Sequence, residues 1–218
     1  MVQRVINLGE SNSLVNEFVS ELRDETGQQD RMRFRRNLIR LGEIFAYEIS
    51  KHLEWENREV TTPLGVSTIP RLKDQPVLAA ILRAALPMHQ GMLNFFDKAD
   101  NAFISAYRQP SSEDGFEIRI EYVSAPALAD RVIVVVDPML ATGSSLVLAC
   151  EELLKNAKPK HLHLVSVISS VVGIDFVKHR LSNFTIWTAA IDEELTAKAY
   201  IVPGLGDAGD LAYGEKDV

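Results

Sequence analysis

The sequence contains a single cysteine, Cys150, among 218 residues. One cysteine cannot form a disulfide within the chain, which fits a reducing compartment and predicts a cytoplasmic protein; its apolar neighbours predict a core position. Long apolar runs are also missing, because the stretches 125–129 and 132–136 fall far short of the roughly 20 residues that a membrane-spanning helix needs. The first ten residues have too short an apolar segment for a signal peptide. We therefore expect neither a membrane partner nor export.

Basic residues are in the minority. The chain has 23 Lys and Arg against 30 Asp and Glu, a formal net charge of −7. Proteins that bind nucleic acid or anionic membranes broadly present a basic surface, so no nucleic-acid partner is expected. With 46% apolar and 24% charged residues, the composition is that of a globular protein. A chain of this length can bury about 70% of its unfolded surface, and residues 1–218 are expected to form one domain.

Helical periodicity and short apolar runs alternate along the chain. After two amphipathic segments, a stretch with Thr, Pro and Gly predicts a hairpin arm at about 58–70. The expected helices are 13–25, 30–53, 88–96, 145–156 and 174–179, and the expected strands are 76–82, 102–107, 116–123, 132–136, 162–168 and 184–188. This alternation predicts an α/β fold with a mostly parallel central sheet flanked by helices. Ligands bind beyond the carboxyl ends of such strands, so the loops after Leu82, Tyr107 and Val136 are expected to carry the chemistry.

The most informative segment, 137–145, follows the apolar run 132–136 and reads Asp-Pro-Met-Leu-Ala-Thr-Gly-Ser-Ser. Gly143 lets backbone N–H groups approach an anion closely, and the hydroxyls and the helix N-terminus around it favour negative charge. The segment is not a Walker loop, since no G-x-x-x-x-G-K-[ST] occurs in the chain. These features favour a cradle for a phosphate monoester over a helix that is merely capped after a tight turn.

A second segment, 200–210, carries Gly204, Gly206 and Gly209, which formally match G-x-G-x-x-G. A dinucleotide site is excluded because only nine residues follow Gly209, too few for a helix of useful length, a second strand and an acid about 20 residues on. The segment is expected to form a rigid, exposed loop whose backbone approaches a flat ligand.

Both segments resemble motifs of the uracil phosphoribosyltransferases. Segment 137–145 is similar to the loop with which this family binds phosphoribosyl pyrophosphate (PRPP), except that Ser144 stands where the family usually has a second glycine. Segment 200–210 is nearly identical to the family's uracil-binding loop, and the resemblance runs from about Arg33 onward. It implies the type I phosphoribosyltransferase fold and a PRPP site that includes Asp137, Pro138, Met139, Leu140, Ala141, Thr142, Gly143, Ser144, Ser145 and Asp207.

The resemblance also assigns roles at uracil. It implies that Ile201, Gly206 and Ala208 hold the base largely through backbone groups, with Asp207 where base and ribose meet. Backbone N–H and C=O groups can match the alternating C=O, N–H, C=O edge of uracil. Cytosine would be rejected, because its amino group would face a donor and leave buried polar atoms unpaired.

Two arginines lie at expected strand ends. Arg83 follows the run that ends at Leu82, and Arg108 follows Tyr107. A lone arginine there is ordinarily a solvated or paired side chain, but guanidinium groups suit phosphate oxygens bidentately. Both match arginines that bind PRPP in the family, and with Asp207 they are the expected catalytic residues.

Two departures from the family pattern bear on activity. Ala85, followed by Leu86 and Pro87, stands where the family usually has a glycine and another small residue. An unusual backbone conformation there would cost Ala85 up to about 1–2 kcal/mol. Segment 169–173 reads Ser-Ser-Val-Val-Gly where the family commonly has an Ala-Pro-Glu-Gly-like loop. Weaker activity or a shifted substrate choice would follow from either.

The resemblance implies that uracil and PRPP react to give UMP and pyrophosphate, a step of pyrimidine salvage. Mg²⁺ is the expected cofactor, held mainly by PRPP and water, with Asp137 on the ribose hydroxyls or on the metal through water. The arm and the resemblance favour a homodimer or larger oligomer, and some relatives are activated by GTP. Two alternatives stay open: a phosphoribosyltransferase for another nucleobase, and a catalytically weak regulator on this scaffold that binds pyrimidine nucleotides.

The remaining patterns favour structural roles. The five arginines of the second expected helix are expected to form a solvated face, on which Arg40 and Glu43 are able to pair. His161 and His163 flank the start of a strand and point to one face, but no third ligand lies at zinc-site spacing.

Overall fold

The computed structural model describes residues 3–110 and 116–215, and for 107–110 and 116–119 it describes the backbone alone. The helices are α1 (Leu14–Arg23), α2 (Arg31–Ser50), α3 (Leu86–Leu93), α4 (Ser144–Leu153), α5 (Val171–Arg180) and α6 (Ala208–Tyr213), with 3₁₀ turns at Leu8–Glu10 and Gly27–Gln29. The strands are β1 (Gln3–Asn7), β2 (Trp55–Thr62), β3 (Gly65–Leu72), β4 (Val77–Leu82), β5 (Asp100–Pro110), β6 (Phe116–Ser124), β7 (Val132–Val136), β8 (Met139–Leu140), β9 (His161–Ser170), β10 (Phe184–Asp192), β11 (Glu194–Leu195) and β12 (Ile201–Val202).

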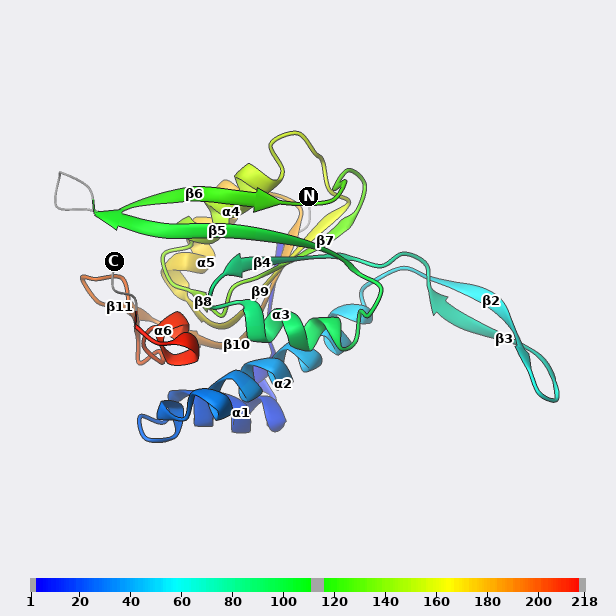
Figure 1. Cartoon of the computed structure of the whole chain (residues 1–218), viewed down its shortest axis with the longest axis horizontal. Coiled ribbons are helices and arrows are strands. Elements are labelled where there is room, and N and C mark those ends of the chain that lie inside the picture. Colours follow the sequence, from blue (N-terminus) through cyan, green and yellow to red (C-terminus); the bar gives the residue numbers. More distant parts are fainter. Residues whose placement is uncertain (1–2, 111–115, 216–218) are drawn as a thin grey trace.

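Eight strands form the central sheet within the described part of the chain. Their order is β1-β10-β9-β7-β4-β5-β6, and β8 pairs with the end of β9. Every neighbouring pair in this sheet is parallel except β5 and β6, which form an antiparallel hairpin. Figure 1 shows helices on both sides of the sheet. The expected α/β fold with a mostly parallel sheet is confirmed.

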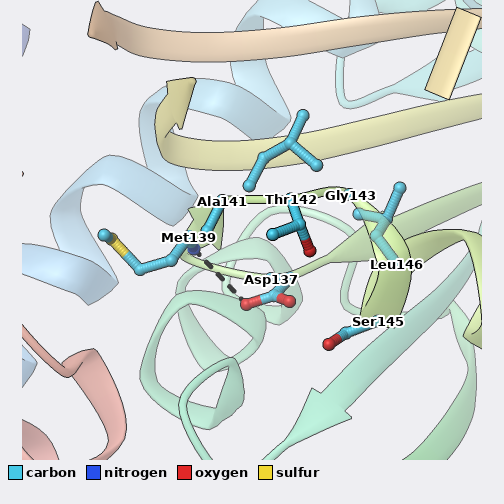
Figure 2. Close-up of a pocket in the computed structure, with 8 residues that line it drawn as sticks. Asp137, Met139, Ala141, Thr142, Gly143, Ser145 and Leu146 are labelled. Carbon is cyan, nitrogen blue, oxygen red and sulfur yellow. Dashed lines mark hydrogen bonds between the residues drawn. The ribbon is translucent and has the colours of Figure 1, made fainter. Parts of the chain in front are cut away.

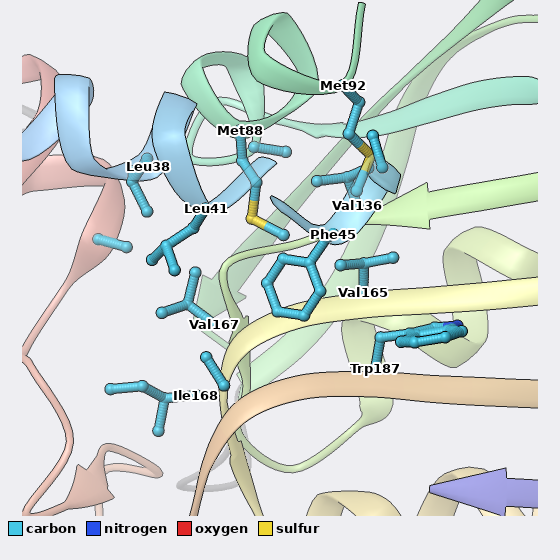
Figure 3. Packing of buried hydrophobic residues seen from close by; sticks show 14 of the residues in the cluster. Leu38, Leu41, Phe45, Met88, Met92, Val136, Val165, Val167, Ile168 and Trp187 are labelled. Atoms are coloured by element: carbon cyan, nitrogen blue, oxygen red, sulfur yellow. The ribbon is translucent and has the colours of Figure 1, made fainter. Parts of the chain in front are cut away.

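Alternating side chains of the buried strands belong to two separate hydrophobic cores, one on each face of the sheet. On β4, Leu78 and Ala80 belong to a core with α1, α2, α3 and α6, whereas Val77 and Ala79 belong to a core with α4 and α5. Figure 3 shows the first core, where Phe45 of α2 lies among strand residues of β7 and β9. Because both faces of the sheet are buried at its centre, the central strands β4 and β7 are continuous apolar runs.

Strand β1 was not predicted from the sequence pattern, and neither were the short strands β8, β11 and β12. Strand β1 is an edge strand that pairs in parallel with β10, from Gln3 opposite Phe184 to Asn7 opposite Thr188. Its first residues are exposed, so it lacks the apolar run that marked the other strands. The predicted arm is confirmed. Its two strands, β2 and β3, together span residues 55–72, which is longer than the predicted 58–70, and they project away from the sheet (Figure 1).

The arginine-rich face of α2 is more engaged than expected. Arg33 pairs with Glu21 of α1 at 2.6 Å, and Arg35 donates to the carbonyl oxygen of Ala212 at 2.7 Å. The expected Arg40–Glu43 pair is wrong: Arg40 donates to Asn37 at 3.0 Å, and Glu43 instead accepts from Asn94 at 2.7 Å. A tertiary partner, Asn94, therefore takes the Glu43 carboxylate, and Arg40 pairs with Asn37 on its own helix instead.

His52 and His163 pack against Trp187 near the amino ends of β9 and β10, and His161 packs against His163. The rings of His161 and His163 lie 4.8 Å apart, and His52 packs edge-on against the indole at 5.2 Å. Among the described residues, no group of three His, Cys, Asp or Glu side chains could hold a metal ion. In the same part of the chain, no helix has both the length and the apolar character to cross a membrane. Cys150 is buried as expected, and burial raises the pKa of its thiol to about 12.

Acidification is expected to destabilise the fold through His163. Burial, with smaller contributions from His161 and His52, lowers the pKa of its imidazole to about 3, and its Nδ1 accepts from Trp187 Nε1 at 3.0 Å. The unfolded chain, with a histidine pKa near 6.5, takes up this proton first. The contribution of neutral His163 to the free energy of unfolding is therefore complete above about pH 6.5. It falls by about 1.4 kcal/mol per pH unit between about pH 6.5 and 3.

Urea unfolding at pH 7 and pH 5 measures this loss. His163→Gln keeps an acceptor for Trp187 but cannot titrate, so its loss between the two pH values should be about 2 kcal/mol smaller than that of the wild type. His179→Gln is the control, because His179 is exposed. Equal losses in the wild type and His163→Gln would contradict the assignment.

Candidate functional site

The carboxyl ends of β4 and β7 lie side by side in the sheet. The two strands pair in parallel, with Ala80 opposite Val136, and each ends at a charged residue, Arg83 after β4 and Asp137 after β7. Parallel pairing brings these two residues to the same edge of the sheet. This is the edge where ligands bind in open α/β folds.

Segment 137–145 forms an open pocket at this edge. The pocket is lined by Asp137, Met139, Leu140, Ala141, Thr142, Gly143, Ser145 and Leu146. Figure 2 shows these side chains around the pocket and the hydrogen bond from the Met139 amide to the Asp137 carboxylate, 3.3 Å long. Seven of the eight are residues named from the sequence. Leu146 was not, because an apolar residue in the first turn of a helix carries no chemical signal.

The two other predicted loop residues support the pocket from outside its lining. Pro138 points its carbonyl oxygen at the sheet, where it accepts from the amides of Val167 and Ile168 at 2.9 and 3.1 Å. Ser144 holds the turn, since its hydroxyl accepts from Thr142 at 3.2 Å and its amide donates to the Thr142 hydroxyl at 3.3 Å. The segment is therefore fixed to β9 on one side and open on the other.

Gly143 begins α4 with its backbone in the left-handed region. Its φ is +81°, and a Cβ there would lie 2.9 Å from the carbonyl oxygen of Gly173 and 3.1 Å from the ring of Phe176. Both the backbone conformation and the close contact require glycine. The turn directs the N-terminus of α4, with the partial positive charge of its first N–H groups, toward the pocket.

Ser170 supports this turn from β9. Its hydroxyl donates to the carbonyl oxygen of Ala141 and accepts from the amide of Gly173 at 2.8 Å, which caps α5. The expectation that 169–173 forms a loop is wrong, because β9 runs to Ser170 and α5 begins at Val171. In the sequence, a serine three residues before Gly173 at the start of a helix indicates a helix cap. It does not indicate the second role of Ser170, the hydrogen bond to Ala141 in the pocket wall.

If the pocket binds PRPP, as the resemblance implies, Ser170→Ala is expected to raise KM for PRPP about five- to tenfold, because losing one neutral hydrogen bond to a pocket-forming carbonyl costs about 1 kcal/mol or more. Steady-state kinetics with varied PRPP measures the change. Ser169→Ala is the control, since the neighbouring Ser169 hydroxyl donates to Thr188 instead, at 3.0 Å. Identical KM values for the two variants would contradict a supporting role for Ser170.

Arg83 is tied to the C-terminal segment. Its Nη2 donates to the Asp210 carboxylate at 3.3 Å and to the carbonyl oxygen of Gly214 at 3.1 Å. Its Nε is buried without a hydrogen-bond partner among the described residues. A buried guanidinium nitrogen without an acceptor is costly, and an anionic ligand at this edge would supply one. Arg108 lies on β5, but its side chain falls outside the described residues, so its role stays a prediction.

The backbone at Ala85 is ordinary. Its φ and ψ are −71° and −19°, it is buried, and it begins α3 with Pro87 in the first turn. Proline fits there because the first helical N–H groups have no intrahelical acceptor. The expected cost of alanine at this position is therefore absent.

Segment 200–210 packs more closely than a wholly exposed loop. Ile201, Gly204, Leu205 and Ala208 are buried, whereas Gly206 is exposed with φ at +92°. The segment also leads into a short helix, α6, although the sequence predicted no helix of useful length after Gly209. Its buried residues belong to the same core as α2 and α3, which is why it lies against the edge that carries Arg83.

Asp207 caps α6. Its Oδ1 accepts from the amides of Gly209 at 2.8 Å and Asp210 at 3.0 Å. This is the geometry of an N-cap, in which a side-chain oxygen pairs with free helix amides. Its predicted position between base and ribose stays a prediction.

Comparisons with known proteins agree on one family. The sequence model described as uracil phosphoribosyltransferase matches residues 10–215. A protein of that name from Porphyromonas gingivalis is 54% identical over 213 residues, which cover 97% of this chain and 99% of the relative. Another from Thermococcus gammatolerans is 37% identical over 94% of this chain and 91% of its own. Among solved structures, the AQ2163 protein from Aquifex aeolicus is similar with a TM-score of 0.87 and 31% identity, covering 98% of this chain and all of that one.

Proposed function

Because the chain belongs to the uracil phosphoribosyltransferase family, we propose that it forms UMP and pyrophosphate from uracil and PRPP in pyrimidine salvage. The observation that carries this proposal is the pocket at the N-terminus of α4, at the edge of the sheet where β4 ends at Arg83. A phosphate group and a polyphosphate can bind at that edge within one substrate molecule.

The 5′-phosphate of PRPP binds in the pocket of segment 137–145. Amides at the start of α4 and the hydroxyls of Thr142 and Ser145 donate to its oxygens, and Gly143 keeps the approach open. Asp137, at the start of the segment, accepts from the ribose hydroxyls. Binding energy at the phosphate, remote from the reacting carbon, holds C1′ in place for attack.

Pyrophosphate leaves toward the arginines. N1 of uracil forms a bond to C1′ while the bond from C1′ to the pyrophosphate oxygen breaks, so the carbon inverts and the N1 proton goes to solvent. Negative charge grows on the leaving group in this step. Arg83 and Arg108 stabilise that charge through charge-assisted hydrogen bonds.

The donor set at the pocket fits Mg²⁺. Asp137 offers hard carboxylate oxygens in the pocket wall, and Mg²⁺ binds through one or two carboxylates together with substrate phosphates and water. Bound with PRPP, the metal would neutralise charge on the departing pyrophosphate. Asp137 is the residue that would hold it, directly or through water.

Uracil binds against segment 200–210. Backbone groups of Ile201, Gly206 and Ala208 match its edge, and the exposed turn at Gly206 leaves room for a flat ring. Asp207 reaches the junction of base and ribose with the carboxylate oxygen that does not cap α6. A site built to pair this edge rejects bases with a different donor pattern by a large factor.

A panel of free bases tests the substrate. With PRPP and Mg²⁺, kcat/KM for uracil should exceed that for cytosine by about 10³-fold or more, because the mismatched amino group leaves buried polar atoms unpaired. Preference for hypoxanthine or adenine would assign a different phosphoribosyltransferase. UMP binding without turnover of any base would assign a regulator. Parallel reactions with GTP test it as an activator.

The arm supports a homo-oligomer. Leu64 at its tip is 99% exposed, and Val66 near the tip and Trp55 at the base of the arm are exposed as well. A two-stranded hairpin is marginally stable alone in water, so a second copy of the chain is the occupant that we propose for it. Sedimentation of the full chain, with Leu64→Ser and Val66→Ser together as the variant, should show a dimer or larger assembly that weakens in the variant. The single buried cysteine is consistent with a cytoplasmic location.

A further inference from the structure

Arg23 and Asp192 form an ion pair beside segment 200–210. Arg23 is the last residue of α1, and Asp192 is the last residue of β10. The two guanidinium nitrogens Nη1 and Nη2 each lie 2.8 Å from one carboxylate oxygen, a bidentate pair. Asp192 is 7% exposed and Arg23 is 23% exposed along its side chain. A pair this well shielded and aligned is stiffer than the surface ion pairs of the chain.

Both members of the pair also bind Gly204. Arg23 Nη1 donates to the carbonyl oxygen of Gly204 at 3.0 Å, and the Gly204 amide donates to Asp192 Oδ2 at 2.9 Å. Gly204 has φ at +55°, and a Cβ there would lie 2.1 Å from the carbonyl oxygen of Ile201. The pair therefore fixes both polar groups of one residue in a turn that only glycine can form.

The same corner holds the next residue of the segment. With its amide nitrogen toward the carbonyls, Gln28 donates to Leu205 at 2.9 Å and to Leu22 at 3.0 Å. Two consecutive carbonyl oxygens, those of Gly204 and Leu205, thus accept from side chains at the end of α1 and in the turn after it. Neither donor belongs to segment 200–210.

Asp192 is also aligned with the support of the phosphate pocket. In the pairing of β9 with β10, Asp192 lies opposite Ser170, and Ser170 donates to Ala141 in the pocket wall. The supports of the two segments are therefore register partners on adjacent strands. A fixed distance between the base and C1′ is what a displacement at C1′ requires.

We infer that Arg23 and Asp192 are positioning residues for the base: by clamping Gly204 they set where the backbone groups of Gly206 and Ala208 meet uracil. The inference rests on the proposed function, since it takes segment 200–210 as the uracil site. Neither residue touches a substrate in this assignment. Only Leu205 separates the clamped Gly204 from Gly206, so the effect of the pair reaches Gly206 through the backbone. We therefore expect it to change base binding rather than PRPP binding.

The test compares Arg23→Met and Asp192→Asn with a matched control. Both variants should raise KM for uracil at least tenfold, leave KM for PRPP within about twofold, and narrow the preference for uracil over cytosine. Arg23→Lys keeps the charge without the bidentate geometry and should give an intermediate KM for uracil. The control is Arg33→Met, which removes another ion pair of α1, that with Glu21, and should leave both KM values unchanged.

The outcomes separate the clamp from general stability. Thermal unfolding accompanies the kinetics, and Arg23→Lys and Asp192→Asn remain informative if Arg23→Met does not fold. Equal rises in the two KM values, or a rise in Arg33→Met as large as in Arg23→Met, would reduce the pair to a structural contact and overturn the inference. An active wild type with unchanged KM for uracil in Arg23→Lys and Asp192→Asn would overturn it too. A wild type inactive on uracil would overturn the proposed function first.

Discussion

Replacing Arg83 with methionine is expected to lower kcat/KM for PRPP by about 10²–10³-fold. Methionine keeps an aliphatic side chain at the end of β4 but removes every donor that could meet the leaving pyrophosphate. Losing one preorganised donor to developing charge costs about 3–4 kcal/mol in comparable sites. Steady-state kinetics with saturating uracil and varied PRPP measures the loss.

Asp210→Asn separates this role from the contact with the C-terminal segment. The Arg83–Asp210 distance is 3.3 Å and both side chains are at least a third exposed, so the pair contributes little to stability. Weakening it leaves Arg83 free to bind an anion, and PRPP kinetics should stay within about threefold of the wild type. An Arg83→Met enzyme within twofold of the wild type would remove Arg83 from the leaving-group site.

Gly143→Ala is expected to abolish most PRPP binding. The variant must place a Cβ at φ near +81° and 2.9 Å from the carbonyl oxygen of Gly173, so the turn must shift. The left-handed backbone costs about 1–2 kcal/mol for a residue with a Cβ, and the shift moves the N-terminus of α4. We expect kcat/KM for PRPP to fall about 100-fold or more, measured by initial rates, with stability lower by about 1–3 kcal/mol in urea.

Gly65→Ala is the matched control. Gly65 also has positive φ, at +158°, but among the described residues no atom outside its two chain neighbours lies within 4 Å of its Cβ position, and it is the first residue of β3, directly after the turn of the arm. Gly65→Ala is therefore expected to leave KM for PRPP unchanged, even if it lowers the free energy of unfolding. If Gly143→Ala kept wild-type PRPP kinetics, segment 137–145 would not be the phosphate site.

Local patterns predicted the parts of the site that are local in the chain. The apolar run of β7, the acid after it and the small residues before α4 are contiguous, so their geometry could be predicted from neighbouring residues alone. The role of Asp207 at the base was implied only by the family resemblance, and the cap that it forms on α6 was not predicted.

The supporting residues could not be predicted, because their roles depend on contacts between residues far apart in the sequence. Ser170 meets Ala141, 29 positions away, and Arg23 meets Asp192, 169 positions away. No spacing in the sequence encodes either contact. The Arg40–Glu43 pair failed for the same reason, since the spacing was right but Asn94 from α3's end competed for the carboxylate. The predicted energetic cost of alanine at position 85 was wrong, because the sequence does not reveal that the backbone there has an ordinary helical conformation.

The most direct test of the account is the release of pyrophosphate by the purified chain with uracil, PRPP and Mg²⁺. The account predicts one pyrophosphate and one UMP for each uracil consumed, and no pyrophosphate when uracil is left out. Pyrophosphate released without uracil, or none released with all three present, would contradict it.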